Sequence, residues 1–527
     1  MMGPMSEETL LRELLELRDV VDDLVERAQM EHQSLAMVLG SLLPAICEKI
    51  GARGAFLESY DEDLHLAVYK HPKDLTIPDW APLVAATSES RREVWSSTSG
   101  SARVVAQPLD VAGTWFGRAG LVLDANSPLP SEDASRKLDL ACEELDNYLF
   151  AIRNAREKHQ MMMDLGRALR HRVLGEGLRL AEEALAKAMP LDRMLMVFVA
   201  DEGSSNKTLH VRLYEEGKVK VDTLGGEADA KIRELGRAYL FDDRRDLLDH
   251  LHFRDAQEEV LINGVTHGHL VGKVLVTSKT GSFNTYGREI LAGFAGFVRQ
   301  RIVDFNKEWR RLAASFRPDD VARLVSLDDY EAKYLAPREE TVGILYVDIA
   351  GFTRVSEQVL RTPSAVAKLV EEWGDEAVNL VWKHGGVFDK MVGDCVIALF
   401  GPPFYEEPPG GRLARAIECA KDIRAMTETF PQRDGFEALR DGGLSVSTGV
   451  NLAPLFVGSF GPNSNFTGFS SGMNNTARLQ GCATRGKIFV MEEALAQLPK
   501  DAPFQFGEME SAAVKHVAQP LRFRELK

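Results

Sequence analysis

The chain has 527 residues and carries 63 basic against 79 acidic side chains, a formal net charge of −16. At roughly 100 to 200 residues per domain this length predicts about three domains, and the acidic balance argues against a duplex nucleic acid partner, which needs a basic surface. The sequence has no run of about 18 to 20 apolar residues that predicts a membrane span, and Met1 to Glu8 lacks the basic and apolar parts of a signal peptide, so we expect a cytoplasmic protein.

An amphipathic helix is predicted over residues 1–32. Its apolar residues recur at alternating spacings of four and three, as in a coiled-coil seam, at Leu10, Leu14, Leu17, Val21 and Leu24. We expect this helix to join two copies of the chain. The alternative is a helix that packs on its own domain, because the repeat spans only a short segment.

Residues 33–155 predict an α+β repeat, with a helix over Leu35 to Ile50, four short strands and a closing helix. The same order returns in residues 156–305, which begin with a helix over Leu178 to Ala188. Strands are expected there at Met194 to Ala200, Thr208 to Leu213 and Gly268 to Thr277, and a closing helix begins near Arg288. The chain therefore contains a tandem of one architecture.

Each repeat resembles a GAF domain, a small-molecule sensor module. The second resembles it better, through Gly272 to Lys279, then Phe283, then Gly287-Arg288-Glu289 before an apolar helix. The members of that family that bind cyclic nucleotides carry Asn-Lys where Ser278 and Lys279 stand here, and an acidic pair at Gly287-Arg288. The resemblance implies two GAF-like sensor units with a possible small-molecule ligand, whose identity stays open.

Large apolar residues continue at spacings of three and four past the end of the second repeat, at Leu291, Phe294, Val298, Ile302, Phe305, Trp309, Leu312 and Phe316. This pattern predicts a continuous helix that pairs with a second copy and passes a movement onward. Pro318 ends or redirects that helix, so residues 306–337 are predicted as a helical linker that ends in a short connector from Val321 to Pro337.

Residues 338–527 predict strand, helix, two strands, helix and strand, the βαββαβ order of a ferredoxin-like core. The first strand runs from Val342 to Val347 into Asp348, and Asp394 lies in the turn between the two paired strands. Apolar strands normally exclude carboxylates, and a hard divalent cation with phosphate oxygens is the usual partner of such a group. We therefore expect Asp348 and Asp394 to lie together and to handle a nucleotide.

Three motifs in this part resemble the class III nucleotidyl cyclase catalytic domain: Asp348-Ile349-Ala350-Gly351-Phe352-Thr353, Lys390-Met391-Val392-Gly393-Asp394 and Met473-Asn474-Asn475-Thr476-Ala477-Arg478-Leu479. The resemblance implies that Asp348 and Asp394 hold two Mg²⁺ or Mn²⁺ ions per active site, with the Ile349 carbonyl as a further ligand. It also implies that the backbone amides from Ala350 to Thr353, with Phe352 and Thr353 among them, cradle the triphosphate.

The resemblance implies roles for five more residues. Lys390 and Thr467 occupy the two positions that select the base, and this pair favours adenine. Asn474 and Arg478, one helical turn apart, position the ribose and stabilise charge on the α-phosphate. Lys515 aligns with a lysine that reaches the triphosphate, although His516 replaces the usual Gly. A second departure is Ser470-Ser471-Gly472-Met473, where Gly-Asp-Thr-Val is usual.

In this family the metal aspartates come from one subunit, and the base-selecting pair, Asn and Arg from the other, so one chain with both sets implies a homodimer with two sites. We expect an adenylyl cyclase that converts ATP to 3′,5′-cyclic AMP and pyrophosphate and is regulated by the GAF-like units. Two alternatives stay open: a guanylyl cyclase, and a degenerate cyclase domain that serves only for ligand sensing and dimerisation.

Overall fold

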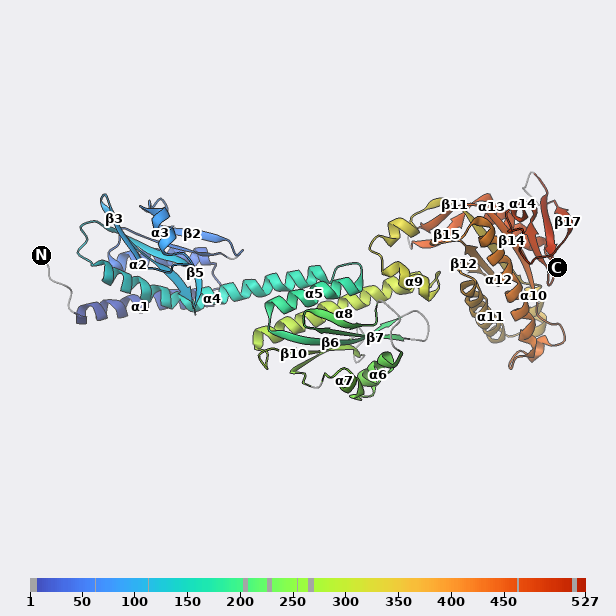
Figure 1. Cartoon of the computed structure of the whole chain (residues 1–527), viewed down its shortest axis with the longest axis horizontal. Coiled ribbons are helices and arrows are strands. Elements are labelled where there is room, and N and C mark those ends of the chain that lie inside the picture. The colour runs from blue at the N-terminus through green and yellow to red at the C-terminus, as the bar shows by residue number, and fades with distance from the viewer. Residues whose placement is uncertain are drawn as a thin grey trace. The chain divides into compact units, whose positions relative to one another are not determined.

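The computed structural model describes residues 7–61, 63–111, 113–201, 207–224, 230–253, 255–263, 270–461, 464–513 and 519–527. These residues form a mixed α+β protein, as predicted from the sequence, which divides into two compact units, Met1–Asp164 and Leu165–Lys527. Figure 1 shows the fold and labels many of its helices and strands.

The first unit is a five-stranded antiparallel sheet in the order β2-β1-β5-β4-β3. One face packs against α1, α2 and α4, and the other packs against α3. The strands are β1 (Gly54–Tyr60), β2 (Leu66–His71), β3 (Trp95–Ser99), β4 (Ala102–Val111) and β5 (Thr114–Asp124). The helices are α1 (Glu7–Met30), α2 (Leu35–Ile50), α3 (Trp80–Ala86) and α4 (Ser131–Ala168).

Helix α1 buries its apolar stripe within its own unit. Leu10, Leu17 and Val21 are at most 8% exposed, and the last two belong to one core with α2 and the sheet. Leu14 and Leu24 are half-buried beside them. The stripe expected to form a seam between two copies is thus covered within one chain, which corresponds to the alternative of a helix that packs on its own domain.

The second α+β repeat lies in the second unit and is also a five-stranded antiparallel sheet, in the order β8-β7-β6-β10-β9. In Figure 1, α5 and α8 lie along one face of this sheet and α6 and α7 along the other. The helices are α5 (Leu174–Ala188), α6 (Ala230–Phe241), α7 (Asp246–His250) and α8 (Thr285–Ala313). The strands are β6 (Leu191–Asp201), β7 (Lys207–Glu215), β8 (Lys218–Asp222), β9 (Glu258–Asn263) and β10 (Leu270–Ser278). The first residues of the strand expected from Gly268 lie outside the described residues.

The two sheets share a strand arrangement. In each, the first strand lies between the second strand and the last strand, and the last strand pairs with the one before it. Each repeat also holds a buried ion pair that involves its own sheet. Glu58 of β1 pairs with Arg118 of β5 in the first repeat, and Glu182 of α5 pairs with Arg212 of β7 in the second. The repetition expected from the sequence is therefore present in the order of four strands, whereas the fifth strand, β3 or β8, lies at opposite edges of the two sheets.

Helix α8 is continuous through most of the region where a long helix was expected, but it ends at Ala313, so Phe316 lies after it. All eight large apolar residues from Leu291 to Phe316 are at most 6% exposed within one chain. As with α1, contacts inside the chain cover the stripe that was expected to pair with a second copy. A spacing of three and four residues specifies a buried face but not the partner that buries it.

The linker after α8 is mostly helical and docks on the following part of the chain. Pro318 begins α9 (Pro318–Val325) as its first residue, and a π-helical turn covers Glu331–Leu335, where a short connector was expected. The Ser315 carbonyl accepts hydrogen bonds from the Phe388 amide at 2.9 Å and from Trp382 Nε1 at 3.1 Å. The end of α8 is thereby attached to the edge of the next sheet.

The last part of the chain is built on an eight-stranded sheet in the order β12-β13-β11-β14-β16-β18-β17, with β15 paired to the end of β14. The strands are β11 (Arg338–Ile349), β12 (Gly386–Val392), β13 (Cys395–Phe400), β14 (Val446–Phe460), β15 (Asn465–Phe469), β16 (Ile488–Met491), β17 (Phe506–Ala512) and β18 (Leu521–Leu526). The helices are α10 (Phe352–Arg354), α11 (Pro363–Lys383), α12 (Pro409–Thr429), α13 (Ser471–Cys482) and α14 (Glu492–Leu495).

The core of this part lies between the sheet and helices α11 and α12. Leu345, Val347 and Ile349 of β11 are fully buried in it with Trp373 of α11 and Ile417 of α12. Side chains alternate between the faces of a strand, so Tyr346 and Asp348 point to the opposite face. That face carries α13, which packs on β14 and β11.

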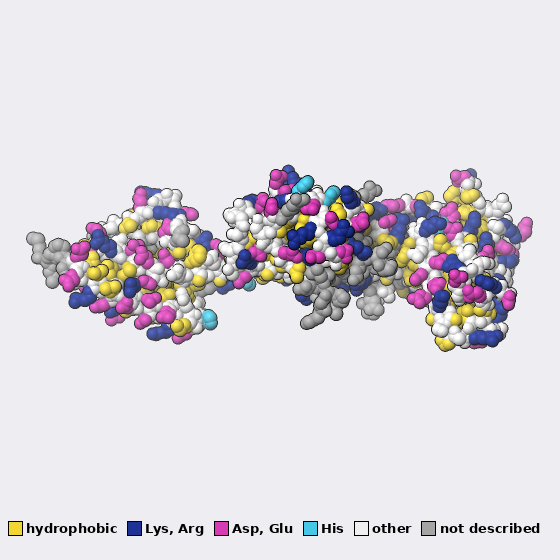
Figure 2. All heavy atoms as spheres, turned by 90° about the horizontal axis from the view of Figure 1, so that it is seen from below, with side chains coloured by type: hydrophobic (Ala, Val, Ile, Leu, Met, Phe, Trp, Pro, Cys, Tyr) yellow, Lys and Arg dark blue, Asp and Glu magenta, His cyan; other side chains and the backbone are white. Residues whose placement is uncertain are grey.

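On the face of the molecule shown in Figure 2, acidic and basic side chains are interspersed with small apolar areas. Among the described residues, we find no helix with the length and apolar character that crossing a membrane requires. The described surface on view is therefore one of mixed charge.

Candidate active site

The structure brings Asp348 and Asp394 together at one end of the central strands. Asp348 on β11 pairs with Cys395 on β13, so the β12–β13 turn carries Asp394 to the end of β11. Gly393 in this turn has φ 64°, a left-handed conformation that suits glycine. The Oδ2 atom of Asp394 is buried and has no hydrogen-bond partner in the structure. The expected juxtaposition of the two carboxylates is therefore found.

Both carboxylates are held in a setting that disfavours two negative charges. Burial and the neighbouring Asp394 raise the pKa of Asp348 to about 6, and Gln480 of α13 opposes this shift. Burial also raises the pKa of Asp394, against a hydrogen bond from the Ile349 backbone. Burial and both aspartates likewise raise the pKa of the Cys395 thiol. A bound cation would relieve this repulsion.

The donor set fits a hard divalent cation that shares its coordination with a substrate. Within the described ranges, no group of three or more His, Cys, Asp or Glu side chains is placed to hold a metal ion. Mg²⁺ is usually held by one or two carboxylates while water and substrate phosphates fill its other positions. Asp348 and Asp394, with the buried oxygen of Asp394 unpartnered, meet that description.

The turn after β11 matches the expected phosphate cradle in part. Gly351 has φ 72° and precedes the short helix α10, and the amides at the start of a helix have no partner within the helix. The Ala350 amide, however, donates to the Ser445 carbonyl at 2.9 Å. This corrects the expectation that the cradle begins at Ala350, because that amide is engaged, and leaves the amides of Gly351, Phe352 and Thr353 for a phosphate.

Lys390 and Thr467 come together around a residue that the sequence reasoning missed, Asp389. The side chain of Asp389 is 1% exposed, and Lys390 Nζ lies 3.7 Å from its Oδ2 atom. Burial raises the pKa of Asp389, and Thr467 and Lys390 favour its ionised form. Thr467 is 8% exposed and lies on β15, which packs beside β12. An ionisable residue on an apolar strand was the available signal, as it was for Asp348.

Helix α13 carries its two expected functional residues on a different face from Gln480, because residues two and six positions apart do not share a helix face. Asn474 is exposed and Arg478 half-buried, whereas Thr476 and Leu479 are fully buried against the sheet. Gln480, also missed from the sequence, donates to Ser447 Oγ at 2.8 Å and acts on Asp348. One face of α13 thus supports the carboxylates of its own chain, and another presents Asn474 and Arg478 outward.

The altered loop before α13 is an ordered helix start. Ser470 accepts a hydrogen bond from the Gly472 amide at 2.9 Å as the N-cap of α13. A Cβ atom on Gly472 would lie 2.5 Å from Ala453 Cβ, so α13 approaches β14 very closely. The altered residues Ser470 and Gly472 are therefore compatible with a capped α13 that packs closely on β14. Lys515 lies outside the described residues.

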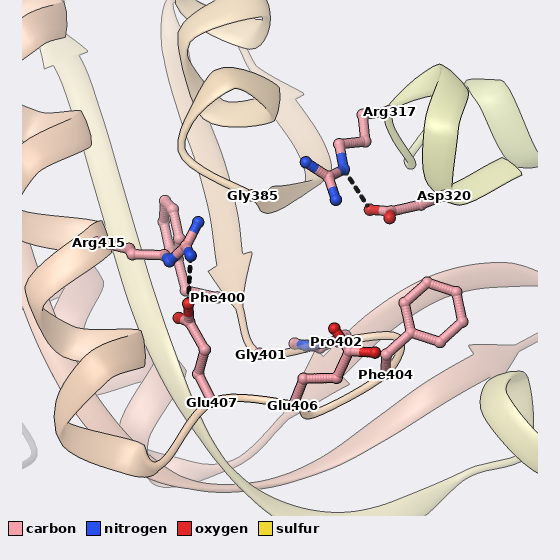
Figure 3. Close-up of a pocket in the computed structure, with 10 residues that line it drawn as sticks. All are labelled: Arg317, Asp320, Gly385, Phe400, Gly401, Pro402, Phe404, Glu406, Glu407 and Arg415. Carbon is pink, nitrogen blue, oxygen red and sulfur yellow. Dashed lines mark ion pairs between the residues drawn. The ribbon is translucent and has the colours of Figure 1, made fainter. Parts of the chain in front are cut away.

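A cavity of about 90 Å³ separates the linker from the loop between β13 and α12 (Figure 3). Arg317 pairs with Asp320 on one side, and Arg415 pairs with Glu407 on the other. No residue that lines it is one of the expected site residues, and it marks the contact between the linker and the last part of the chain.

Comparison with known proteins assigns the last part of the chain. Residues 335–523 match the model of the adenylate and guanylate cyclase catalytic domain. This segment belongs to that family. The cyclase domain is thus the part that holds Asp348 and Asp394, at the ends of neighbouring strands.

Curated relatives match over the same part of the chain. The uncharacterized protein Rv1318c of Mycobacterium tuberculosis is 22% identical over 196 residues, which are 36% of this chain and 34% of the relative. The uncharacterized protein Mb1353c of Mycobacterium bovis is 25% identical over 152 residues, which are 28% of this chain and 25% of the relative. The matched part therefore spans about a third or less of the length of these relatives.

Among solved structures, the adenylyl cyclase CyaB from P. aeruginosa is 22% identical, with a TM-score of 0.33, and the match covers 37% of this chain and 96% of that one. The guanylyl cyclase Cya2 is 22% identical, with a TM-score of 0.32, over 36% of this chain and 93% of that one.

Proposed function

We propose that the chain is an adenylyl cyclase that converts ATP to 3′,5′-cyclic AMP and pyrophosphate. The observation that carries the proposal is the pair of half-buried carboxylates Asp348 and Asp394, joined by the strand pairing of β11 and β13 within a cyclase domain. We interpret β11, α11, β12, β13, α12 and β14 as its ferredoxin-like core, because their order is βαββαβ and the strands lie in the order β12-β13-β11-β14.

Asp348 and Asp394 would hold two divalent cations, Mg²⁺ or Mn²⁺, with the carbonyl of Ile349 as a further ligand. When bound, such ions acidify a ribose 3′-hydroxyl and neutralise the charge of the triphosphate. The amides of Gly351, Phe352 and Thr353 would bind phosphate oxygens at the start of α10, with Lys515 as a further cation. The 3′-oxygen then attacks the α-phosphate, and pyrophosphate leaves.

Base selection would rest on Lys390 and Thr467. The Lys390 ammonium donates hydrogen bonds only, which suits N1 of adenine, an acceptor, and opposes N1–H of guanine. Thr467 would meet the group at C6 of the purine. The close approach of β12 to β15 supports placing both residues at one base.

Asn474 and Arg478 would complete the site of a second copy of the chain. Arg478 would stabilise charge that develops on the α-phosphate, since a guanidinium stays protonated and matches phosphate oxygens. Asn474 is exposed, and both residues lie on a different face of α13 from Gln480, which acts on Asp348; this supports a homodimer with two shared sites. Residues 33–155 and 156–305 would be GAF-like sensor domains that regulate the cyclase through α8 and the linker 306–337.

The test uses the purified full chain with ATP or GTP, in separate and competing reactions, with Mg²⁺ or Mn²⁺. Chromatography of the products should give cyclic AMP in excess over cyclic GMP. Asp348→Asn should abolish both products, and Asp375→Asn, a change at an exposed position on α11, should leave them unchanged. Excess cyclic GMP would make the chain a guanylyl cyclase, and activity that survives Asp348→Asn would refute the assigned metal site.

A further inference from the structure

The most unusual charged group outside the metal pair is Asp389. Its side chain is 1% exposed, and neither carboxylate oxygen has a hydrogen-bond partner in the structure. A buried carboxylate without hydrogen bonds costs several kcal/mol, so such a group calls for a role. Its neighbour in the sequence, Lys390, offers only a contact at 3.7 Å.

A β-bulge explains how Asp389 reaches this position. Along β12, Phe388 pairs with Ala398 of β13, and Lys390 pairs with the next residue, Ile397, so Asp389 is an extra residue in the ladder. Consecutive residues of a regular strand point to opposite faces, whereas a bulge re-aims a side chain and bends the strand. Asp389 and Lys390 can therefore approach the same partner.

That partner is Thr467. Its hydroxyl is buried and also has no hydrogen-bond partner in the structure. β15, which carries Thr467, packs beside β12, and Phe466 and Asp389 line one cavity of about 280 Å³. The Thr467 side chain is close enough to Asp389 to favour its ionised form. Two unpartnered polar groups, one an acceptor and one a possible donor, thus share one buried region.

We propose that Asp389 is a specificity-determining positioning residue, which accepts the hydroxyl proton of Thr467 and so makes Thr467 an acceptor toward the base. A threonine hydroxyl has one proton and two lone pairs. Once the proton is directed to Asp389, Thr467 offers only lone pairs to the purine. These suit the 6-amino group of adenine and repel the 6-oxo group of guanine. The inference rests on the proposed function, because it explains how the same site distinguishes ATP from GTP.

Two linker residues, Ser315 and Phe316, hold the strands that carry Asp389 and Thr467. The edge of β12 is fixed by the hydrogen bond from the Phe388 amide to the Ser315 carbonyl, and Phe316 packs on Phe466 with ring centroids 5.0 Å apart. Phe388, next to Asp389, is therefore held by Ser315, and Phe466, next to Thr467, is held by the adjacent Phe316. This shared anchor keeps the two strands in one relative position.

The test compares kcat/KM for ATP and for GTP in the full chain. Asp389→Asn should lower kcat/KM for ATP relative to that for GTP by about 10-fold, which corresponds to the loss of one hydrogen bond to a charged group. The reason is that an amide at position 389 can donate a hydrogen bond to Thr467, so the hydroxyl proton of Thr467 becomes available to the 6-oxo group of guanine. Asp389→Ala is the second variant, and Asp375→Asn, also Asp to Asn but exposed, is the control expected to keep the wild-type ratio.

A structural role is separated by a double-mutant cycle. In a Thr467→Val background, which has no hydroxyl to orient, Asp389→Asn should change the ratio less than about 2-fold. An equal change of the ratio in both backgrounds would overturn the inference, and so would an unchanged ratio in both Asp389 variants. If both Asp389 variants unfolded, the inference would also be overturned, because Asp389 would then serve stability. A wild-type chain that makes no cyclic nucleotide would instead refute the proposed function.

Discussion

Asp348 and Cys395 lie directly opposite each other on β11 and β13, and this single pairing brings Asp394, the residue before Cys395, to the end of the central strand. The register is secured on the other side by β14, which pairs with β11 from Arg338 to Ile349. A slip by one residue would turn Asp348 into the core with α11 and α12. The register of β11 therefore determines the candidate metal site.

The first prediction concerns pH and metal ions. The pKa of Asp348 rises from 3.8 to about 6 in the folded chain, so folding favours its protonated form. The contribution of Asp348 to the free energy of unfolding is fully present below about pH 4 and falls as the pH rises to about 6. Above about pH 6 this contribution is absent. Mn²⁺ binds the ionised form, so it should raise the melting temperature more at pH 7.5 than at pH 5. Thermal unfolding with Mn²⁺ or EDTA measures this.

Asp348→Asn supplies the control for that experiment. Without metal at pH 7.5 it should melt above the wild type, because it removes one charge of a repelling pair, and the difference should shrink toward pH 4. The variant should also lose most of the shift caused by Mn²⁺. A wild-type shift that is the same at both pH values, or is retained in the variant, would contradict the assignment of Asp348 as a ligand.

The second prediction concerns the shared sites of the proposed dimer. Asp348→Asn and Arg478→Ala should each be inactive alone. When the two chains are mixed and allowed to exchange, half of the dimers combine one of each, and each such dimer has one intact site. Activity should then return to about a quarter of the wild-type value. Mixing Asp348→Asn with Asp394→Asn is the matched control and should stay inactive, since both changes affect the same half of a site.

The sequence was sufficient to predict that Asp348 and Asp394 lie together, because the information that brings them together is local. Each aspartate follows an apolar strand, and a hairpin of adjacent strands places Asp394 beside the first strand of the fold. Asp389 was missed for a related reason. Strand alternation assigns neighbouring residues to opposite faces, and the bulge between Phe388 and Lys390 breaks that rule without a mark in the hydrophobic pattern.

The helices show a different limit. The apolar stripes of α1 and α8 were recognised, but their partner was expected to be a second copy, whereas residues such as Val21 and Phe294 are fully buried within one chain. The pattern records that a face is buried, and both partners produce the same spacing. The role of Gln480 likewise could not be predicted from the sequence, because it depends on the packing of α13, which places Gln480 beside Asp348.

The third prediction tests the close approach of α13 to the sheet. A Cβ atom on Gly449 of β14 would lie 2.7 Å from the backbone of Thr476 and Gln480, so Gly449→Ala must displace the helix that carries Asn474 and Arg478. We expect a loss of about 1 to 3 kcal/mol in the free energy of unfolding and a fall in kcat, measured by denaturant titration and by product formation.

Gly481→Ala is the matched control for Gly449→Ala. Gly481 lies near the end of α13, and an added Cβ would meet nothing within 4 Å. Alanine favours a helix over glycine, so this variant should be stabilised by up to about 1 kcal/mol with unchanged kcat. If the two variants were equally stable, the prediction that a Cβ atom on Gly449 displaces α13 would be contradicted.

The fourth prediction concerns the buried ion pair of the second repeat. The side chains of Arg212 and Glu182 are 3% and 0% exposed, and Arg212 Nε donates to Glu182 Oε1 at 2.8 Å. Burial raises the pKa of Glu182, and Arg212 opposes that shift. Arg212→Met leaves the carboxylate buried and unpaired, so it should lower the free energy of unfolding by about 3 to 5 kcal/mol.

Adding Glu182→Leu to Arg212→Met should recover most of that loss, because the unpaired buried charge is then removed, while Asp222, which also pairs with Arg212, is 28% exposed and can be solvated. Arg244→Met breaks an exposed pair with Asp246 and should cost less than about 1 kcal/mol. Denaturant unfolding of the three variants decides the point: a double variant as unstable as Arg212→Met would show that packing of the arginine, and not its charge, stabilises this repeat.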